Sequence, residues 1–201
     1  MPTWDERYTA AEGYLFGTAP SAFLTAQKSK LPASGSALAV ADGDGRNGVW
    51  LAEQGLDVLA VDGSSVALEK SRQLAAEHGV TVRHELADLL TWDFGHERYD
   101  VVVGIFIQFT KPAQRAVMFR AMQDALKPGG LLIVQGYRPE QLAYGTGGPP
   151  DAENMYTEAI LREAFADLDI EHLASYDAEL HEGRHQGMSA LIDMVARKPT
   201  G

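Results

Sequence analysis

Three glycines and a carboxylate in the first third of the chain have the spacing of a nucleotide-binding site. Gly43, Gly45 and Gly48 match G-x-G-x-x-G after a short apolar run, and Asp62 follows about 20 residues after the first glycine. Glycine lets the backbone approach a ligand closely, and a carboxylate there can accept hydrogen bonds from both ribose hydroxyls. The pattern predicts an adenosine-containing cofactor, either a nicotinamide dinucleotide or S-adenosylmethionine. Asp62 could instead cap the helix that follows Gly63.

The elements that must position these residues alternate between β-rich runs and helical stretches. We expect strands at 36–41, 57–61, 80–86, 99–106 and 131–135, and helices at 48–54, 64–78 and 112–126. The segment 127–130 is expected to stop the third helix and form a turn. A loop over 138–155, a helix over 156–165 and a closing antiparallel pair at 168–176 and 188–196 complete the chain.

This order predicts an α/β fold: a Rossmann-like, doubly wound sheet, mostly parallel with an antiparallel C-terminal strand, and helices on both faces. The length favours a single domain over 1–201. Within it we expect N-terminal lid helices over 1–34, a cofactor-binding core over 35–136, and a substrate loop with closing strands over 137–201. Ligands of such sheets bind beyond the carboxyl ends of the strands.

Further short motifs narrow the choice of cofactor. Asp88 and Leu89 follow the third expected strand, Tyr99-Asp100-Val101-Val102 opens the fourth, and Lys127-Pro128-Gly129-Gly130 precedes the fifth. With these, the sequence resembles the class I S-adenosylmethionine-dependent methyltransferases. It is most similar to the branch related to the tellurite-resistance and thiopurine methyltransferases, through Gly43-Asp44-Gly45-Arg46-Asn47, Trp4-Asp5-Glu6-Arg7-Tyr8 and Pro139-Glu140-Gln141-Leu142.

The resemblance implies S-adenosyl-L-methionine as cofactor and a set of residues to hold it. Gly43 and Gly45 would lie under its methionine part, Asp62 on the ribose, and Asp88 with Leu89 at the adenine. The full set is Asp42, Gly43, Gly45, Asn47, Asp62, Gly63, Asp88, Leu89, Gly104 and Phe106. Relatives usually carry an acidic residue at position 39 and a glycine at 41, where this chain has Ala39 and Ala41. Either Asp42 takes over the missing acid's contact with the cofactor's amino group, or the chain binds the cofactor more weakly.

The resemblance further implies methyl transfer to a small molecule, such as a thiol, a metalloid oxyanion or another soft nucleophile. Two alternatives stay open: an NAD(P)-dependent oxidoreductase, and a non-catalytic S-adenosylmethionine-binding protein. A hydroxyl or phenol acceptor would need a general base, for which His185, with His181 nearby, is the candidate. Trp4, Tyr8, Tyr14 and Phe16 would form a lid or anchor the N-terminus, and Tyr137 and Tyr144 would lie at the substrate loop. Asp44 and Arg46 are expected to be exposed loop residues.

Composition excludes several kinds of site. The chain has no cysteine, which removes disulfides, thiolate metal sites and a cysteine nucleophile. Its 17 basic and 28 acidic residues give a net charge of −11, which argues against a nucleic-acid substrate. No metal-ligand spacing occurs among the six histidines. The longest apolar run, Val101–Phe109, is too short to cross a bilayer, and the N-terminus does not resemble a signal peptide, so we expect a cytoplasmic protein without a membrane partner. The oligomeric state stays open.

Overall fold

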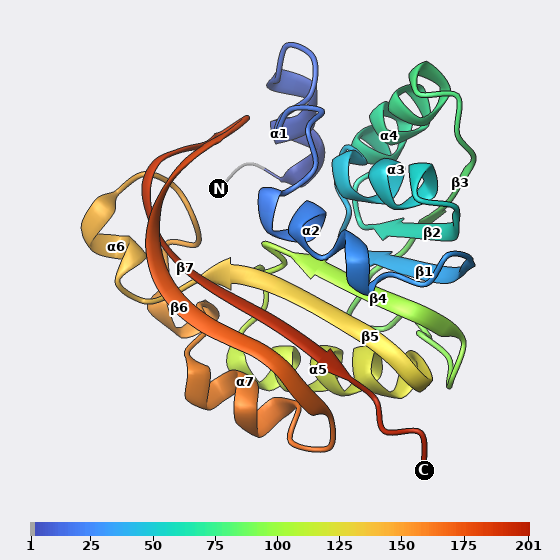
Figure 1. Ribbon diagram of the computed structural model, residues 1–201. Coiled ribbons are helices and arrows are strands. Elements are labelled where there is room, and N and C mark those ends of the chain that lie inside the picture. The colour runs from blue at the N-terminus through green and yellow to red at the C-terminus, as the bar shows by residue number, and fades with distance from the viewer. Residues whose placement is uncertain (1–2) are drawn as a thin grey trace.

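The computed structural model describes residues 3–201, so Met1 and Pro2 of the expected N-terminal segment lie outside the described residues. Seven strands form one sheet in the order β3-β2-β1-β4-β5-β7-β6 (Figure 1). The strands are β1 (Gly35–Val40), β2 (Leu56–Asp62), β3 (Val82–Leu86), β4 (Tyr99–Ile105), β5 (Leu126–Tyr137), β6 (Asp169–Glu182) and β7 (His185–Arg197). The helices are α1 (Trp4–Ala10), α2 (Ala22–Ala26), α3 (Arg46–Glu53), α4 (Ser65–Glu77), α5 (Pro112–Ala125), α6 (Gln141–Tyr144) and α7 (Glu158–Ala164), with short 3₁₀ turns at Lys28–Lys30 and Ala152–Asn154.

The strand directions confirm the predicted fold class. Strands β1 to β5 pair in parallel, whereas β7 runs antiparallel to both β5 and β6. Chain order reverses between β1 and β4, because β1 leads outward through β2 to β3 and the chain then returns to β4. In sheets of this kind the ligand site lies beyond the carboxyl ends of the strands at this reversal.

Both faces of the sheet are covered, and for that reason the central strands are apolar throughout. Side chains alternate along β1, so that Leu38 and Val40 join one core beneath α5 and α7, while Ala37 and Ala39 join the other beneath α2 and α3. Figure 1 shows α5 and α7 on one side of the sheet and α2, α3 and α4 on the other. The small side chains of Ala37 and Ala39 let α3 approach the sheet closely.

Several elements differ from the expectation: the expected loop over 138–155 contains α6 and a 3₁₀ turn, and two strand boundaries move by more than a few residues. β5 begins at Leu126, directly after α5, and residues 127–130 bulge out of its pairing with β4: Tyr99 pairs with Leu126 and Val101 with Leu131. The antiparallel pair is also longer than predicted, since β6 and β7 remain paired to Glu182 and His185. Its outer half carries polar residues on exposed positions, which conceals the alternation of a strand.

The N-terminal segment crosses the carboxyl edge of the sheet. A capping box between Thr3 and Glu6 begins α1, and the Ser21 side chain caps α2. Lys70 of α4 donates hydrogen bonds to the carbonyls of Tyr8, Ala11 and Gly13, at 2.6, 3.2 and 2.5 Å, where α1 ends. These bonds dock α1 against α4, next to the end of β2.

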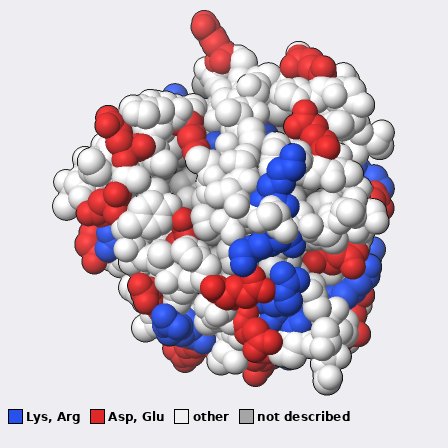
Figure 2. All heavy atoms as spheres, viewed as in Figure 1, with Lys and Arg blue, Asp and Glu red and all other residues white. Residues whose placement is uncertain are grey.

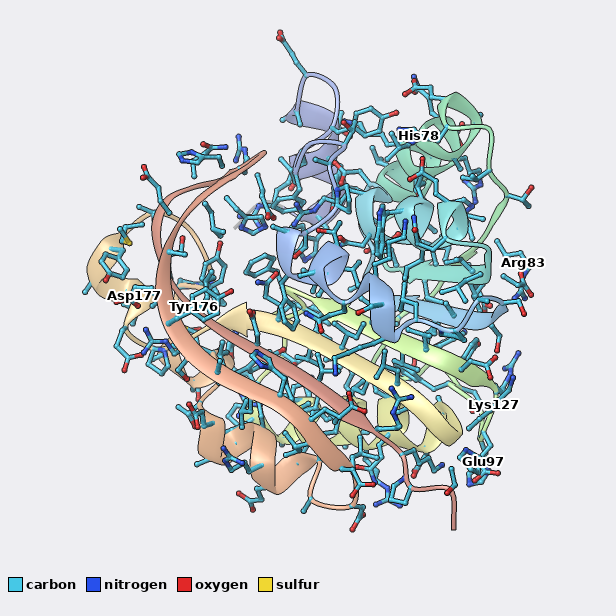
Figure 3. The ribbon with its side chains drawn as sticks, in the orientation of Figure 1. His78, Arg83, Glu97, Lys127, Tyr176 and Asp177 are labelled. Atoms are coloured by element: carbon cyan, nitrogen blue, oxygen red, sulfur yellow. The ribbon has the colours of Figure 1, made fainter. Side chains whose placement is uncertain are left out.

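The charged surface is mixed. Figure 2 shows acidic side chains spread over one face of the molecule, with basic side chains beside them. Glu171, for example, accepts hydrogen bonds from both Lys30 at 2.6 Å and Arg197 at 2.7 Å. Figure 3 labels Lys127, which lies at the opposite end of the sheet from Tyr176 and Asp177 of β6 and pairs with Asp100 at 2.8 Å. Within residues 3–201, no helix is long and apolar enough to span a membrane.

Candidate functional site

A cavity of about 1000 Å³ opens at the carboxyl ends of β1, β2 and β4, where strand order reverses. Most of the residues expected from the sequence line it. They are Trp4, Tyr8, Asp42, Gly43, Asn47, Asp62, Gly63, Asp88, Leu89, Phe106, Tyr137 and His185. The cofactor-binding and substrate residues named from the sequence thus meet in one space, although they come from all parts of the chain.

The loop after β1 has the backbone shape that its glycines allow. Gly43 has φ +61°, and a Cβ there would stand 2.4 Å from the Tyr8 hydroxyl, so that only glycine fits. Asp62 holds this loop from the end of β2: its two carboxylate oxygens accept from the amides of Gly43 at 2.9 Å and Ser64 at 2.8 Å. Burial raises the pKa of Asp62. Ser64 is the residue that caps α4, so the Asp62 carboxylate holds the loop and the cap residue in place while it borders the cavity.

Asp42 turns its carboxylate onto the first turn of α3. Both oxygens lie 3.1 Å from the amide nitrogen of Gly48. A Cβ built on Gly48 would stand 2.4 Å from Asp42 Oδ2 and 3.6 Å from the Cβ of Ala39, so the Asp42 carboxylate occupies space beside the small residue of β1. Burial, reinforced by nearby Asp62 and Asp44, raises the pKa of Asp42 to about 8.

Ala41 adopts φ +48°, in the left-handed region that disfavours side chains. The family that the sequence resembles usually carries glycine at this position. The chain therefore keeps the sharp turn that ends β1 and accepts strain to do so.

Asp44 and Arg46 are not exposed, contrary to the expectation from sequence; their side chains connect distant segments. Asp44 is 1% exposed and accepts from the amides of Leu15 at 2.5 Å and Phe16 at 3.3 Å. Arg46 is 4% exposed and pairs with Glu182 at the end of β6, at 2.8 Å. Their partners are 28 to 136 residues away in sequence, so that no local pattern could reveal them.

The wall at the end of β3 is built by Asp88 and Leu89. Asp88 is exposed and accepts from the Leu90 amide at 3.0 Å, which is a turn interaction, while its carboxylate also borders the cavity. Leu89 is buried beside it. Together, these two residues offer a ligand one polar and one apolar contact at the β3 end of the cavity.

The opposite end of the cavity is aromatic. The His185 ring stacks between Phe106 and Phe16, with centroids 4.3 and 4.8 Å away. Its Nδ1 is hydrogen-bonded to the Tyr137 hydroxyl. Burial lowers the pKa of His185 to about 3 and raises that of Tyr137, so both rings are neutral at pH 7. Phe106 reaches this position with φ +58°, which is a strained conformation at the end of β4.

Five of the residues named from sequence do not line the cavity. Gly45 packs on Ser71 of α4, and Gly104 faces Ile107 and Met122 beneath the sheet. Tyr14 donates to Glu77 at 3.2 Å, Tyr144 donates to Asp177 at 2.9 Å, and the side chain of His181 is 71% exposed. Gly45 and Gly104 allow close packing around the loop and strand, whereas the two tyrosines fix surface segments.

Several polar lining residues were not named as site residues from sequence, among them Gln108 and Asn154. Gln108 donates to the Tyr137 carbonyl at 2.8 Å and accepts from the Tyr137 amide at 2.6 Å, which joins the end of β4 to β5. Gln108 interrupts the apolar run Val101–Phe109, and a polar residue in such a run could have been recognised from the sequence as a site candidate. Asn154 is 8% exposed and lies in the loop before α7, where no pattern marks it. Across residues 3–201 no group of three or more His, Asp or Glu is placed to hold a metal ion.

The comparisons with known proteins agree with this geometry. Residues 37–130 match the family described as a methyltransferase domain. The chain aligns over 119 residues with the carboxy-S-adenosyl-L-methionine synthase of Geobacter metallireducens, at 31% identity, covering 57% of this chain and 46% of that protein. The chain thus spans less than half the length of the curated relatives that it matches.

Solved structures share the fold at low identity. A structure reported for the conversion of a disulfide bond into a thioacetal group during echinomycin biosynthesis superposes with a TM-score of 0.77, at 19% identity, over 97% of this chain and 87% of that one. TehB from Haemophilus influenzae gives 0.75, at 18% identity, over 90% and 63%. The N-methyltransferase NodS from Bradyrhizobium japonicum, bound to S-adenosyl-l-homocysteine, gives 0.67, at 15% identity, over 88% and 84%.

The family match and the fold point the same way. Residues 37–130, a little under half of the chain, match a methyltransferase domain, and the solved structures show that the whole chain shares the fold of methyltransferases. The G-x-G-x-x-G match is part of that domain, since it falls within residues 37–130.

Proposed function

We propose that this chain transfers the methyl group of S-adenosylmethionine to a small-molecule acceptor, in the first instance a thiol, a metalloid oxyanion or another soft nucleophile. The observation that carries this proposal is the two-ended cavity. Carboxylates and loop amides line one end, and a neutral, aromatic pocket forms the other. When bound, the cofactor supplies an electrophilic methyl group on a sulfonium, and the enzyme's task is to orient the two reactants and exclude water.

The chain's own residues divide this task. Asp62 would accept from the ribose hydroxyls, Asp88 and Leu89 would flank the adenine, and Asp42 would face the ammonium of the methionine part. Phe16 and Phe106 would cover the methyl group. The cavity's volume of about 1000 Å³ lies at the upper end of small-molecule and cofactor sites, which leaves room for a small acceptor beside the cofactor.

Two observations support a soft acceptor. No ionised base faces the aromatic end, because His185 and Tyr137 are both neutral and hydrogen-bonded to each other. A thiolate or metalloid oxyanion needs no base to attack the methyl group. The fold neighbour from echinomycin biosynthesis is reported to convert a disulfide into a thioacetal, which is chemistry at sulfur. The activity of the carboxy-S-adenosylmethionine synthases is not carried over, since this chain spans under half of their length.

Ligand-induced stabilisation tests the cofactor half of the proposal. At a hundredfold excess over its dissociation constant, a ligand stabilises the folded state by about 2.7 kcal/mol. For a domain of this size that is a rise in Tm of roughly 5–10 °C. We expect such a rise with S-adenosylmethionine and S-adenosylhomocysteine but not with NAD or NADP. A rise with a dinucleotide alone would overturn the proposal in favour of an oxidoreductase.

An acceptor panel tests the transfer half. Thiols, selenite, tellurite, phenols and amines are incubated with S-adenosylmethionine, and S-adenosylhomocysteine and methylated products are measured. We expect thiols or metalloid oxyanions to be methylated fastest. Methylation of amines or neutral alcohols alone would contradict the soft acceptor, and tight cofactor binding without any transfer would favour a non-catalytic binding protein.

A further inference from the structure

His185 is held more firmly than a residue at the tip of a hairpin usually is. It is the first residue of β7, 9% exposed, with its ring stacked within 15° of the Phe16 plane and within 24° of the Phe106 plane. Gly183, two residues earlier, packs so closely on Phe16 that a Cβ there would stand 2.1 Å from its backbone. The imidazole therefore has one orientation, fixed from both faces.

The Tyr137 hydroxyl selects which ring nitrogen carries the proton. This hydroxyl is buried, and its one partner within residues 3–201 is His185 Nδ1. If Nδ1 donated to the tyrosine, the phenolic proton would be left without an acceptor, which costs about 1–3 kcal/mol in a buried site. The hydroxyl therefore donates to Nδ1, and the neutral ring carries its proton on Nε2.

Charge around the ring keeps it neutral. Arg46 of α3 lies close enough to disfavour an imidazolium and is itself paired with Glu182 of β6 at 2.8 Å. Arg184 precedes His185 on the hairpin and also lines the cavity, while the neighbouring residues of β4 and the N-terminal segment are the apolar Phe106 and Phe16. No carboxylate contacts the ring among these groups. The Nε2 atom forms no hydrogen bond to any described residue, and His185 borders the cavity.

We propose that His185 is a hydrogen-bond donor, through Nε2–H, to an acceptor molecule that binds already ionised, as a thiolate, phenolate or oxyanion, and that Tyr137 is the positioning residue that fixes this tautomer. This inference rests on the proposed function. The acceptor loses its proton to water before it binds. A lone pair of the ionised acceptor then forms a bond to the methyl carbon, while the bond between that carbon and the sulfonium sulfur breaks. The electron pair of the broken bond stays on sulfur, which becomes the uncharged thioether of S-adenosylhomocysteine. No protein group takes up a proton, so His185 is not a general base.

The tautomer can be measured without turnover. Long-range ¹H–¹⁵N correlation spectra of histidine-labelled protein distinguish the Nε2–H form, the Nδ1–H form and imidazolium, and His185→Gln assigns the signal. We expect His185 to be neutral with the proton on Nε2 from pH 5 to 8, and Tyr137→Phe to produce a mixture of tautomers. Tyr99→Phe is the matched control, because the buried Tyr99 hydroxyl has no partner among the described residues. An imidazolium or an Nδ1–H form at pH 7 overturns the proposal.

A series of thiols or phenols of graded pKa separates donor from base. As a donor, His185 gives a pH profile of kcat/KM whose midpoint follows the pKa of each acceptor. His185→Ala should lower kcat/KM by about 10–100-fold, the worth of a hydrogen bond to a charged group, and His185→Gln should recover much of it. A midpoint that is the same for every acceptor and disappears in His185→Gln would identify a general base and overturn the proposal. If nothing in the series is methylated, the proposed function fails, and the tautomer measurement still decides the role of His185.

Discussion

Asp62 performs two tasks with one carboxylate, and a substitution can separate them. Asp62→Asn keeps an oxygen for the Gly43 or Ser64 amide but loses the charge and one of its two acceptor oxygens. We expect S-adenosylmethionine to bind at least about 30-fold more weakly, equivalent to ~2 kcal/mol, because a charge-assisted contact with the ribose is lost. Isothermal titration measures this change. Asp57→Asn, an exposed position on the same strand, is the control. Unchanged affinity would mean that Asp62 only holds the Gly43 loop and the amide of Ser64.

Asp42 is the second residue whose charge can be tested. Asp42→Asn retains an acceptor for the Gly48 amide while removing the acid that the cofactor's ammonium would hold in its ionised form. If the carboxylate holds the cofactor's ammonium, S-adenosylmethionine should bind about 10-fold or more weakly, and adenosine, which lacks that ammonium, should bind unchanged. Titrations with both ligands make the comparison. An equal loss for both would indicate a distorted loop, and no loss for either would show that Asp42 does not replace the acid missing at Ala39.

Residue types alone could predict the cofactor loop but not the contacts that support it. Gly43 and Asp62 lie where their spacing predicted, since strand ends and glycine turns are local features. The sequence predicts exposed side chains at Asp44 and Arg46, because nothing near them reveals their hydrogen bonds with Leu15 and Glu182. A charged side chain is buried when a distant partner satisfies it, and only the folded chain supplies that partner.

The N-terminal segment is the element whose attachment has the clearest test. The amides of Leu15 and Phe16 both donate to Asp44, so Asp44→Ala leaves two partly buried donors without an acceptor. We expect faster hydrogen exchange at these two amides, by at least about tenfold, and weaker binding of cofactor and acceptor as Phe16 leaves the wall of the cavity. Exchange mass spectrometry and titration report these effects. Exchange that stays at parent rates would show that the other contacts, such as those of Lys70 and of Ser64 with Asp5, hold the segment without Asp44.

Among the elements, the sheet was predictable, including the antiparallel pair of β6 and β7, but the outer half of that pair was not. The strands over 36–41 and 57–61 were placed within one residue, because buried parallel strands are continuous apolar runs bounded by glycine. The hairpin of β6 and β7 extends beyond the helices that cover the rest of the sheet, so its outer residues are polar and carry no strand pattern. That unpredicted extension is what brings His185 to the cavity.

The whole molecule should respond to pH through its buried carboxyls. Asp42, Asp44, Asp62 and Asp193 have raised pKa values, Asp42 to about 8 and Asp193 to about 6, so the folded chain binds more protons than the unfolded chain. Their contribution to the free energy of unfolding falls as pH rises from about 4 through these values. His84 and His185 have lowered pKa values and act oppositely up to about pH 6.5.

Between pH 6.5 and 8, these histidines therefore no longer offset the stability that is lost as the buried carboxyls ionise. We expect the free energy of unfolding, measured by urea denaturation, to fall by at least about 1 kcal/mol over this interval, the equivalent of one pKa unit. Asp42→Asn should flatten the profile and be more stable than the parent at pH 8. Stability that rises from pH 6.5 to 8 in the parent would contradict a raised pKa at Asp42.

The match to the methyltransferase domain ends at residue 130, and this boundary divides the cavity as well as the chain. Asp42, Asp62 and Asp88 lie inside the matched segment, whereas Phe16, Tyr137, Asn154 and His185 lie outside it. Under the proposed function, changes in the loop before α7 and in the hairpin tip would alter the acceptor while leaving Asp42, Asp62 and Asp88 in place. Grafting those two segments from another protein of this fold would then change the acceptor and leave the carboxylate end of the cavity as it is.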